Sequence, residues 1–90
     1  MPRGGPRLRA TNGKKNLVGE RVEERRKEMQ FTQAMLTARL AYVTEGNWNP
    51  TLQEVLHIEQ GTRLVSDVEV VSLAEALGVK ACWLLTGVME

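Results

Sequence analysis

The chain has 90 residues, 42% of them hydrophobic, and a formal net charge of +1, which is enough for one small domain. A domain of this size buries only about 60 to 65% of its extended surface. No run of about 18 apolar residues occurs and no signal-peptide hydrophobic region follows the N-terminus, which argues against a membrane span and an export signal. We therefore expect a cytoplasmic protein. The single cysteine, Cys82, excludes an internal disulfide and lies in an apolar run, where a buried thiol is expected rather than catalysis.

Positive charge is concentrated at the N-terminus. Residues 1–15 have five basic residues, no acidic residue, two Pro, three Gly and no apolar periodicity, so we expect a disordered basic tail there. Residues 16–90 have seven basic and eleven acidic residues and form the folded, acidic domain. Such a domain can bind nucleic acid only if its positive charge gathers on one face.

Two helices are predicted in the first half of this domain. From Leu17 on, an inner stripe at helical spacing is formed by Val18, Val22, Arg26 and Met29. Thr32 is a good N-cap for a second helix, whose apolar positions are Met35, Leu36, Leu40 and Val43. Glu45-Gly46 ends this helix. Residues 47–50, Asn-Trp-Asn-Pro, form a non-helical connector in which Trp48 packs down.

The next helix is the most clearly delimited. Thr51 and Glu54 form a capping box at its start, and Gly61 closes it near Gln60. Helical spacing gives a packing stripe of Leu52, Val55, Leu56 and Glu59, and a polar stripe of Gln53, His57 and Gln60. A helix of about ten residues is marginal alone in water, so the rest of the domain must hold it. One stripe is available for packing and the other for a polar partner.

The C-terminal third predicts two more helices. Ser66 and Glu69 form a second capping box, and Gly78 closes the helix that it opens. The predicted inner side of this helix consists of Val68, Val71, Leu73, Ala74 and Leu77. Residues 81–85 form a last apolar turn or two, which Thr86-Gly87 ends. The domain is therefore predicted to be all-α, with five helices and no strand.

Two charged residues lie on stripes that are otherwise apolar. Arg26 lies on the inner stripe of the first helix and Glu59 on the packing stripe of the third. A buried charge without a partner is very costly, so we expect these two residues to form a structural ion pair between the two helices. The alternative is that both side chains reach around to solvent.

The order of these motifs resembles the lambda-repressor-like (XRE/Cro-type) helix-turn-helix family over Val18 to Gly87. Five segments carry the resemblance: Val-Gly-Glu-Arg-Val-Glu-Glu-Arg-Arg-Lys-Glu (18–28), Phe-Thr-Gln-Ala-Met-Leu (31–36), His-Ile-Glu-Gln-Gly (57–61), Val-Ser-Asp-Val-Glu (65–69) and Leu-Ala-Glu-Ala-Leu-Gly-Val…Trp-Leu-Leu-Thr-Gly (73–87). It implies a compact bundle of five helices and sequence-specific DNA binding, usually to repress transcription as a dimer. The protein would then be bacterial or phage-encoded and nucleoid-associated. The family has a matching Arg and Glu that bridge the first and third helices.

Matching the family position by position gives candidate DNA contacts. Leu52, Gln53 and His57 would read bases, by packing on a thymine methyl, by bonding adenine N6 and N7, and by donating to guanine N7 or O6. No Arg or Lys lies on this helix, which implies a modest preference for A·T. Phosphate contacts are expected from Gln33, Thr51, Gln60, Thr62, Arg63 and, more weakly, Arg39. The N-terminal arginines would either follow the duplex as an arm or remain solvated.

The chain departs from the family in one respect. Gln33 and Glu59 are 26 residues apart, more than a helix-turn-helix with a turn of three or four residues needs. This implies an extended second helix and a longer connector. Asp67, Glu69 and Glu75 would repel phosphate, so we expect them to face away from DNA.

Other functions remain open at this stage. A helix-turn-helix-derived protein-interaction module, such as an adaptor or an antitoxin-like half, is the main alternative. An enzyme is the least favoured reading, because one His, one Cys and scattered carboxylates form no acid-base pair or nucleophile dyad. A metal site is not indicated, since His57 has no second His and no Cys pair nearby. The sequence also indicates no cofactor and no small-molecule substrate. The expected partner is double-stranded DNA with a palindromic operator. The protein is expected to bind it as a weak homodimer, formed through the last helix and Val88-Met89.

Overall fold

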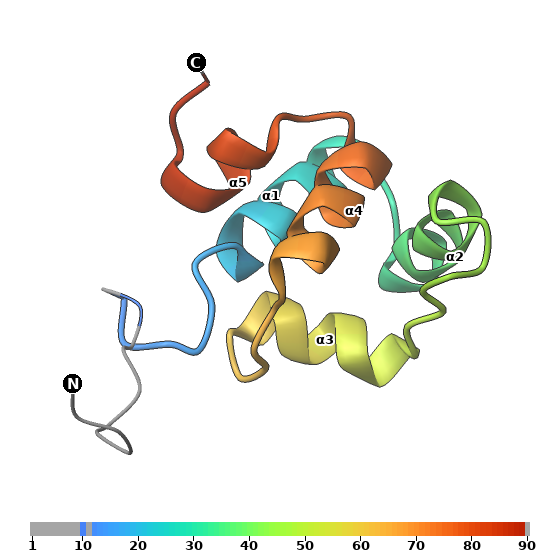
Figure 1. The fold of residues 1–90 in the computed structure, drawn as a ribbon, viewed down its shortest axis with the longest axis horizontal. Coiled ribbons are helices and arrows are strands. Elements are labelled where there is room, and N and C mark those ends of the chain that lie inside the picture. The colour runs from blue at the N-terminus through green and yellow to red at the C-terminus, as the bar shows by residue number, and fades with distance from the viewer. Residues whose placement is uncertain (1–9, 11, 90) are drawn as a thin grey trace, which may run out of the picture.

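A computed structural model describes residue 10 and residues 12–89. Its helices are α1 (Gly19–Glu28), α2 (Gln33–Val43), α3 (Leu52–Gln60), α4 (Asp67–Leu77) and α5 (Ala81–Thr86). The described residues include no strand. The predicted all-α architecture of five helices is therefore confirmed (Figure 1).

The starts of α2, α3 and α4 are set by the side chains that the sequence indicates. The hydroxyl of Thr32 accepts a hydrogen bond from a backbone N–H in the first turn of α2. Thr51 and Glu54 form a complete capping box at the start of α3. Ser66 and Glu69 form the same arrangement at the start of α4. Each cap satisfies backbone N–H groups that have no partner within the helix, which contributes about 1 kcal/mol.

Residues with left-handed backbone conformation end the same helices. Gly61 and Gly78 follow α3 and α4 with φ of 78° and 66°, where a side chain would be strained. Glu45 and Gly46 follow α2 with φ of 52° and 82°. The predicted ends of these three helices are thus confirmed, because local sequence chemistry sets them.

The connector between α2 and α3 is held against the bundle. The hydroxyl of Thr44 donates to the carbonyl of Leu40 within α2 and accepts a hydrogen bond from the backbone N–H of Trp48. Trp48 is partly buried against the core, and Pro50 is buried. Trp48 thus packs the connector against the core, as predicted. The long connection between α2 and α3 is therefore part of the folded structure.

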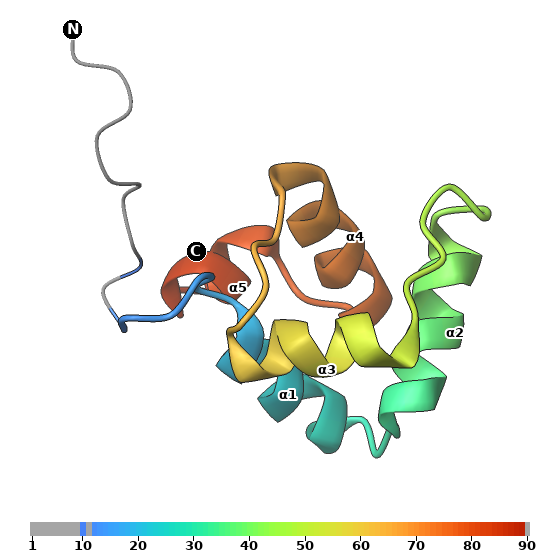
Figure 2. The same ribbon diagram turned by 90° about the horizontal axis from the view of Figure 1, so that it is seen from below.

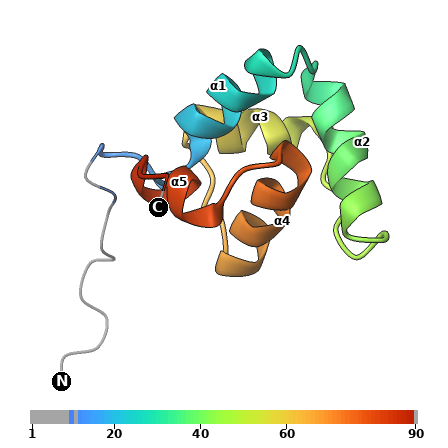
Figure 3. The same ribbon diagram turned by 90° about the horizontal axis from the view of Figure 1, so that it is seen from above.

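Helix α3 forms one outer face of the bundle. It runs along the lower edge in Figure 1, beneath α1 and α4, and Figure 2 shows it from below, in front of both. In Figure 3, seen from above, α3 lies between α1 and α4 and farther from the viewer. Helix α2 packs against α3 and α4 at one end, and α5 packs against α4 at the other. One side of α3 is therefore covered by the bundle, and its opposite side faces solvent.

The core is aliphatic, as the composition predicts. It consists of Val18, Val22, Leu36, Leu40, Val55, Ile58, Val70, Leu73, Ala74, Ala76, Leu77 and Leu84. Burial of a Val, Leu or Ile side chain contributes about 1.5 to 3 kcal/mol. Helix α3 contributes Val55 and Ile58 to this core, which offsets the marginal stability of so short a helix.

The predicted inner faces of α3 and α4 need correction. Val68 and Val71 are 71% and 60% exposed, whereas Val70 is buried and faces the core. In α3, Ile58 is buried and Leu52 is half exposed, so Leu52 does not belong to the packing stripe. Valines at three of four consecutive positions fit more than one helical face, and packing against α2 and α5 selects the face that contains Val70.

The predicted tail, residues 1–15, lies partly outside the described residues, which exclude 1–9 and 11. Its last residues contact the domain. The backbone N–H of Lys15 donates to the carbonyl of Gly61, and the Lys14 ammonium lies 3.1 Å from a carboxylate oxygen of Glu20. Residues 12–15 therefore lie against the end of α3 and the start of α1, which differs from the disorder expected there.

Candidate nucleic-acid interface

The site is built on the two unlike sides of α3. Val55, Ile58 and Glu59 are buried on the side that faces α1 and α2. Leu52 and Gln53 are exposed and His57 is partly exposed. The three predicted base-reading residues are thus all accessible to a partner, and they lie on a helix that forms an outer face of the bundle.

The predicted ion pair between Arg26 and Glu59 is present. Nε of Arg26 lies 2.6 Å from Oε2 of Glu59, and its Nη2 lies 3.1 Å from Oε1. The two side chains are 9% and 2% exposed. The hydrogen bond to Glu59 raises the pKa of Arg26 above its ordinary value. The remaining guanidinium nitrogen donates to the carbonyl of Phe31, so the pair joins α1, the α1–α2 turn and α3.

Gln33 completes this network. Its side-chain Nε2 donates to Oε1 of Glu59 over 2.9 Å. The side-chain amide nitrogen is therefore committed to α3. Gln33 is the first residue of α2, so its backbone N–H is one of the groups without an intrahelical partner. A phosphate only accepts hydrogen bonds, so a phosphate contact by Gln33 would use this N–H or the second hydrogen of the side-chain Nε2.

Asn16 fixes the opposite end of α3, and the sequence analysis did not identify it. Its Nδ2 donates to the carbonyls of Ile58 and Arg63, over 3.2 and 2.9 Å. Its Oδ1 accepts from the backbone N–H groups of Val18 and Gly19, in the manner of a helix cap. A Cβ on Gly19 would lie 2.2 Å from the carbonyl oxygen of Ile58, which shows how closely α1 approaches α3. An Asn just before a helix was the available signal.

A shallow hollow lies beside the C-terminal half of α3, and we call it the α3 hollow. It is lined by Lys15, Glu54, His57, Thr62, Arg63 and Leu64. Nδ1 of His57 lies 3.0 Å from Oγ1 of Thr62. Lys15, which the sequence assigned to the tail, therefore lies next to two predicted contact residues. Its backbone hydrogen bond to Gly61 holds this residue at the end of α3.

Arg63 is held by two carboxylates of its own chain. Its guanidinium makes two hydrogen bonds to Glu69, over 2.9 and 3.0 Å, and lies 3.5 Å from Oε2 of Glu54. The hydrogen bond from Arg63 is the main cause of a lowered pKa at Glu69. Arg63 does not present a free cation beside α3, so a phosphate would have to compete with both carboxylates. Glu69 is turned toward Arg63.

The other predicted phosphate contacts are dispersed. Thr51 and Gln60 are exposed at the two ends of α3. The hydroxyl oxygen of Thr51 accepts the capping hydrogen bond, and its hydrogen remains available as a donor. Arg39 is exposed on α2, with its guanidinium 5.9 Å from the centre of the Tyr42 ring. Thr51 and Gln60 thus lie at the ends of the helix that carries the predicted base-reading residues, while Arg39 lies on a neighbouring helix.

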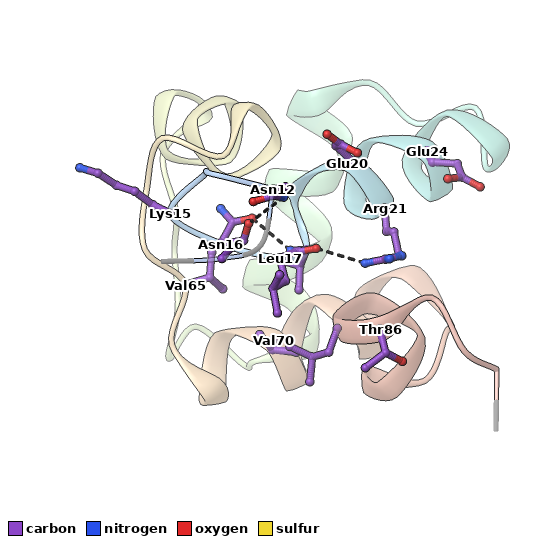
Figure 4. Close-up of a pocket in the computed structure, with 13 residues that line it drawn as sticks. Asn12, Lys15, Asn16, Leu17, Glu20, Arg21, Glu24, Val65, Val70 and Thr86 are labelled. Carbon is purple, nitrogen blue, oxygen red and sulfur yellow. Dashed lines mark hydrogen bonds between the residues drawn. The ribbon is translucent and has the colours of Figure 1, made fainter. Parts of the chain in front are cut away.

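A second surface feature lies between α1, α4 and α5, which we call the α1–α5 groove (Figure 4). Its apolar lining includes Leu17, Val65, Val70 and Leu85. Arg21 crosses one side and donates to the carbonyls of Leu17 and Leu84, which fastens α5 to α1. The groove is open to solvent, and its charged lining residues are Lys15, Glu20, Arg21 and Glu24.

Comparison of the chain with family models, curated proteins and solved structures gave no match. The resemblance to helix-turn-helix proteins therefore rests on the residues of this chain. Within the described residues, no group of three or more His, Cys, Asp or Glu side chains is arranged to hold a metal ion. None of the described helices combines the length and apolar character that crossing a bilayer requires.

Proposed function

We propose that this protein is a sequence-specific DNA-binding transcriptional regulator of the repressor type, which reads the major groove with α3. The observation that carries the proposal is the division of α3 into a buried side, locked by the Arg26–Glu59 pair, and an outer side that carries Leu52, Gln53 and His57. A recognition helix needs both features, because base contacts lose their value if the helix can rotate or slide. We propose a cytoplasmic, nucleoid-associated location.

The chemistry of these three residues sets the expected operator. Gln53 offers both a donor and an acceptor, the pattern that adenine presents through N6 and N7. Leu52, at 51% exposure, offers an apolar surface suited to a thymine methyl group. The outer side of α3 has no Arg or Lys, the usual readers of guanine. We expect an A·T-leaning half-site of a few base pairs.

A weak homodimer on a palindromic site follows from the small size of one half-site. Exposed apolar residues at the C-terminal end support it. Leu85, Val88 and Met89 are 39%, 55% and 60% exposed, and Leu85 also lines the α1–α5 groove. Contacts through this end would leave α3 of each copy accessible, since α5 packs against α4 rather than α3.

One observation favours the alternative of a protein-interaction module. Leu64, Val68 and Val71 are 57%, 71% and 60% exposed; Val68 and Val71 lie on one face of α4, and Leu64 lies in the segment just before this helix. Asp67 and Glu75 are exposed nearby in the sequence. An apolar stripe with acidic neighbours would suit a basic, amphipathic segment of another protein.

Selection from a random duplex library, followed by a salt titration of the selected duplex, tests the proposal. We expect a palindromic, A·T-leaning motif and an affinity that falls steeply with salt, because phosphate contacts release counterions. Gln53→Ala should degrade the motif. Val71→Ala, an equally conservative truncation on the outer side of α4, should leave it unchanged. If the folded wild-type protein enriches no sequence at low salt, the proposal is wrong and the interaction module takes its place.

A further inference from the structure

His57 is the only histidine of the chain, and its ring is held by a neighbouring side chain. Nδ1 lies 3.0 Å from Oγ1 of Thr62, the first residue after the glycine that ends α3. The same Oγ1 lies 3.4 Å from the backbone carbonyl oxygen of His57. Thr62 therefore contacts α3 through the imidazole of His57, in which either ring nitrogen can carry the hydrogen.

The geometry indicates which partner donates. A neutral imidazole has one N–H donor and one acceptor nitrogen, and the hydrogen bond made by one nitrogen sets the role of the other. If Nδ1 carried the hydrogen, the protein acceptor left for the Thr62 hydroxyl would be the carbonyl at 3.4 Å, which is long for an O–H···O bond. If the hydroxyl donates to Nδ1 instead, its hydrogen takes the nearer acceptor. The second arrangement leaves the hydrogen on Nε2.

We infer that Thr62 is a positioning residue that holds His57 with Nε2–H as an outward donor, and thereby makes His57 select base edges that present acceptors. Guanine presents O6 and N7 as adjacent acceptors in the major groove, whereas cytosine presents an amino donor. An Nε2–H group therefore favours guanine and rejects cytosine at the base pair it faces. This inference rests on the proposed function of α3. It also assigns Thr62 a part in base recognition rather than the phosphate contact expected from the sequence.

The charged residues around His57 are compatible with this arrangement. The α3 hollow brings Lys15, Glu54 and Arg63 near the ring. Glu54 is the carboxylate among them, and it already accepts from the backbone N–H of Thr51 and pairs with Arg63. The hydrogen bond to Thr62 is the one that the described residues make with the ring of His57. Nε2–H thus remains available for a base.

The ring nitrogens can be observed directly, because a protein with one histidine gives one pair of imidazole ¹⁵N signals. At pH 8, the wild type is expected to show a protonated Nε2 and an unprotonated Nδ1. In Thr62→Val, which keeps the shape of the side chain and removes the hydroxyl, the two shifts should move toward each other as the tautomers mix. Thr62→Ser should restore the wild-type spectrum.

Thr86→Val is the matched control, since the Thr86 hydroxyl donates to a backbone carbonyl of α5 and not to His57. It should leave the imidazole signals unchanged. A protonated Nδ1 in the wild type, or a Thr62→Val spectrum identical to that of the wild type, overturns the inference. Neither result requires DNA.

A DNA arm separates this inference from the proposed function. In the duplex selection, the preference of Thr62→Val for guanine at the base pair that His57 reads should be about two- to tenfold weaker than that of the wild type. This factor corresponds to the free energy of one hydrogen bond. Thr62→Ser should restore the preference. Circular dichroism of each variant checks that it is folded. If the wild type selects no sequence, the proposed function fails. If the wild type selects a sequence and Thr62→Val keeps the same preference at every position, only the inference fails.

Discussion

The two sides of α3 differ in how firmly their polar groups are fixed. On the buried side, Glu59 receives hydrogen bonds from Arg26 and Gln33, and its side chain is 2% exposed. On the outer side, Gln53 is exposed, and His57 is held by Thr62 alone. The polar groups of one short helix thus divide between holding the helix in place and remaining available to a partner. Substitutions on the two sides should therefore affect different measurements.

The largest effect is expected on the buried side. Arg26→Ala leaves the carboxylate of Glu59 buried without its cation, which should lower the free energy of unfolding by about 3 to 5 kcal/mol. Urea unfolding measures this loss. Lys27→Ala removes an exposed cation from the next position of α1 and should cost far less, because its pair with Glu23 is on the surface. An unchanged melting temperature in Arg26→Ala would remove the basis for a locked helix.

The outer side should show the reverse pattern. Gln53→Ala is expected to change the free energy of unfolding by less than about 0.5 kcal/mol, as at other exposed sites. Its affinity for the selected duplex should fall by about 1 to 3 kcal/mol, and the preference for adenine at one position should relax. Fluorescence anisotropy with matched and mismatched duplexes measures both.

Gln60→Ala provides the contrast on the same helix. As a phosphate contact, Gln60 should affect all duplexes alike and leave the preference intact. A Gln53→Ala protein that binds matched and mismatched duplexes with the wild-type ratio would mean that this side of α3 does not read bases.

A smaller loss of stability is expected from the cap at the start of α3. Thr51→Ala removes the capping hydrogen bond to the backbone N–H of Glu54 and should cost about 1 kcal/mol of stability. Thermal unfolding followed by circular dichroism measures it, and Thr51→Ser should retain most of the stability. Equal stability of the Ala variant and the wild type would show that tertiary packing alone fixes the start of the helix.

The smallest effect concerns pH. Because the hydrogen bond from Arg63 lowers the pKa of Glu69 in the folded protein, the pair stabilises the fold at pH values above the ordinary glutamate value of 4.5. This contribution is lost as the pH falls from there through the lowered pKa. Glu69→Gln should flatten this part of the stability profile in urea unfolding between pH 7 and pH 3. Glu75→Gln, an exposed carboxylate on the same helix, should keep the wild-type profile, and a Glu69→Gln profile that matches it contradicts the account.

Local chemistry made part of this molecule predictable. Thr51 with Glu54, Ser66 with Glu69 and the glycine after each helix fix the helix ends through hydrogen bonds that span three or four residues. The Arg26–Glu59 pair was predictable for another reason: a charge on an apolar stripe requires a partner, and each stripe had one charge.

Features that depend on distant partners were not predictable. Asn16 bonds carbonyls that are 42 and 47 residues away, and Lys15 contacts Gly61. The local sequence could indicate at most a helix cap at Asn16, and it says nothing about these distant contacts. Arg63 was expected to donate hydrogen bonds to phosphate. Its hydrogen bonds to Glu69 form only when the turn after α3 folds back, so the sequence alone did not indicate them. Val71 was misplaced because its spacing fits two helical faces, and only tertiary packing decides between them.

Binding of DNA by the outer side of α3 is tested most directly by titrating ¹⁵N-labelled protein with the selected duplex and following the backbone and side-chain signals. We expect the largest shifts at Leu52, Gln53 and His57, including the side-chain amide of Gln53, with little change on the outer side of α4. Shifts concentrated at Leu64, Val68 and Val71, with α3 unchanged, would contradict it.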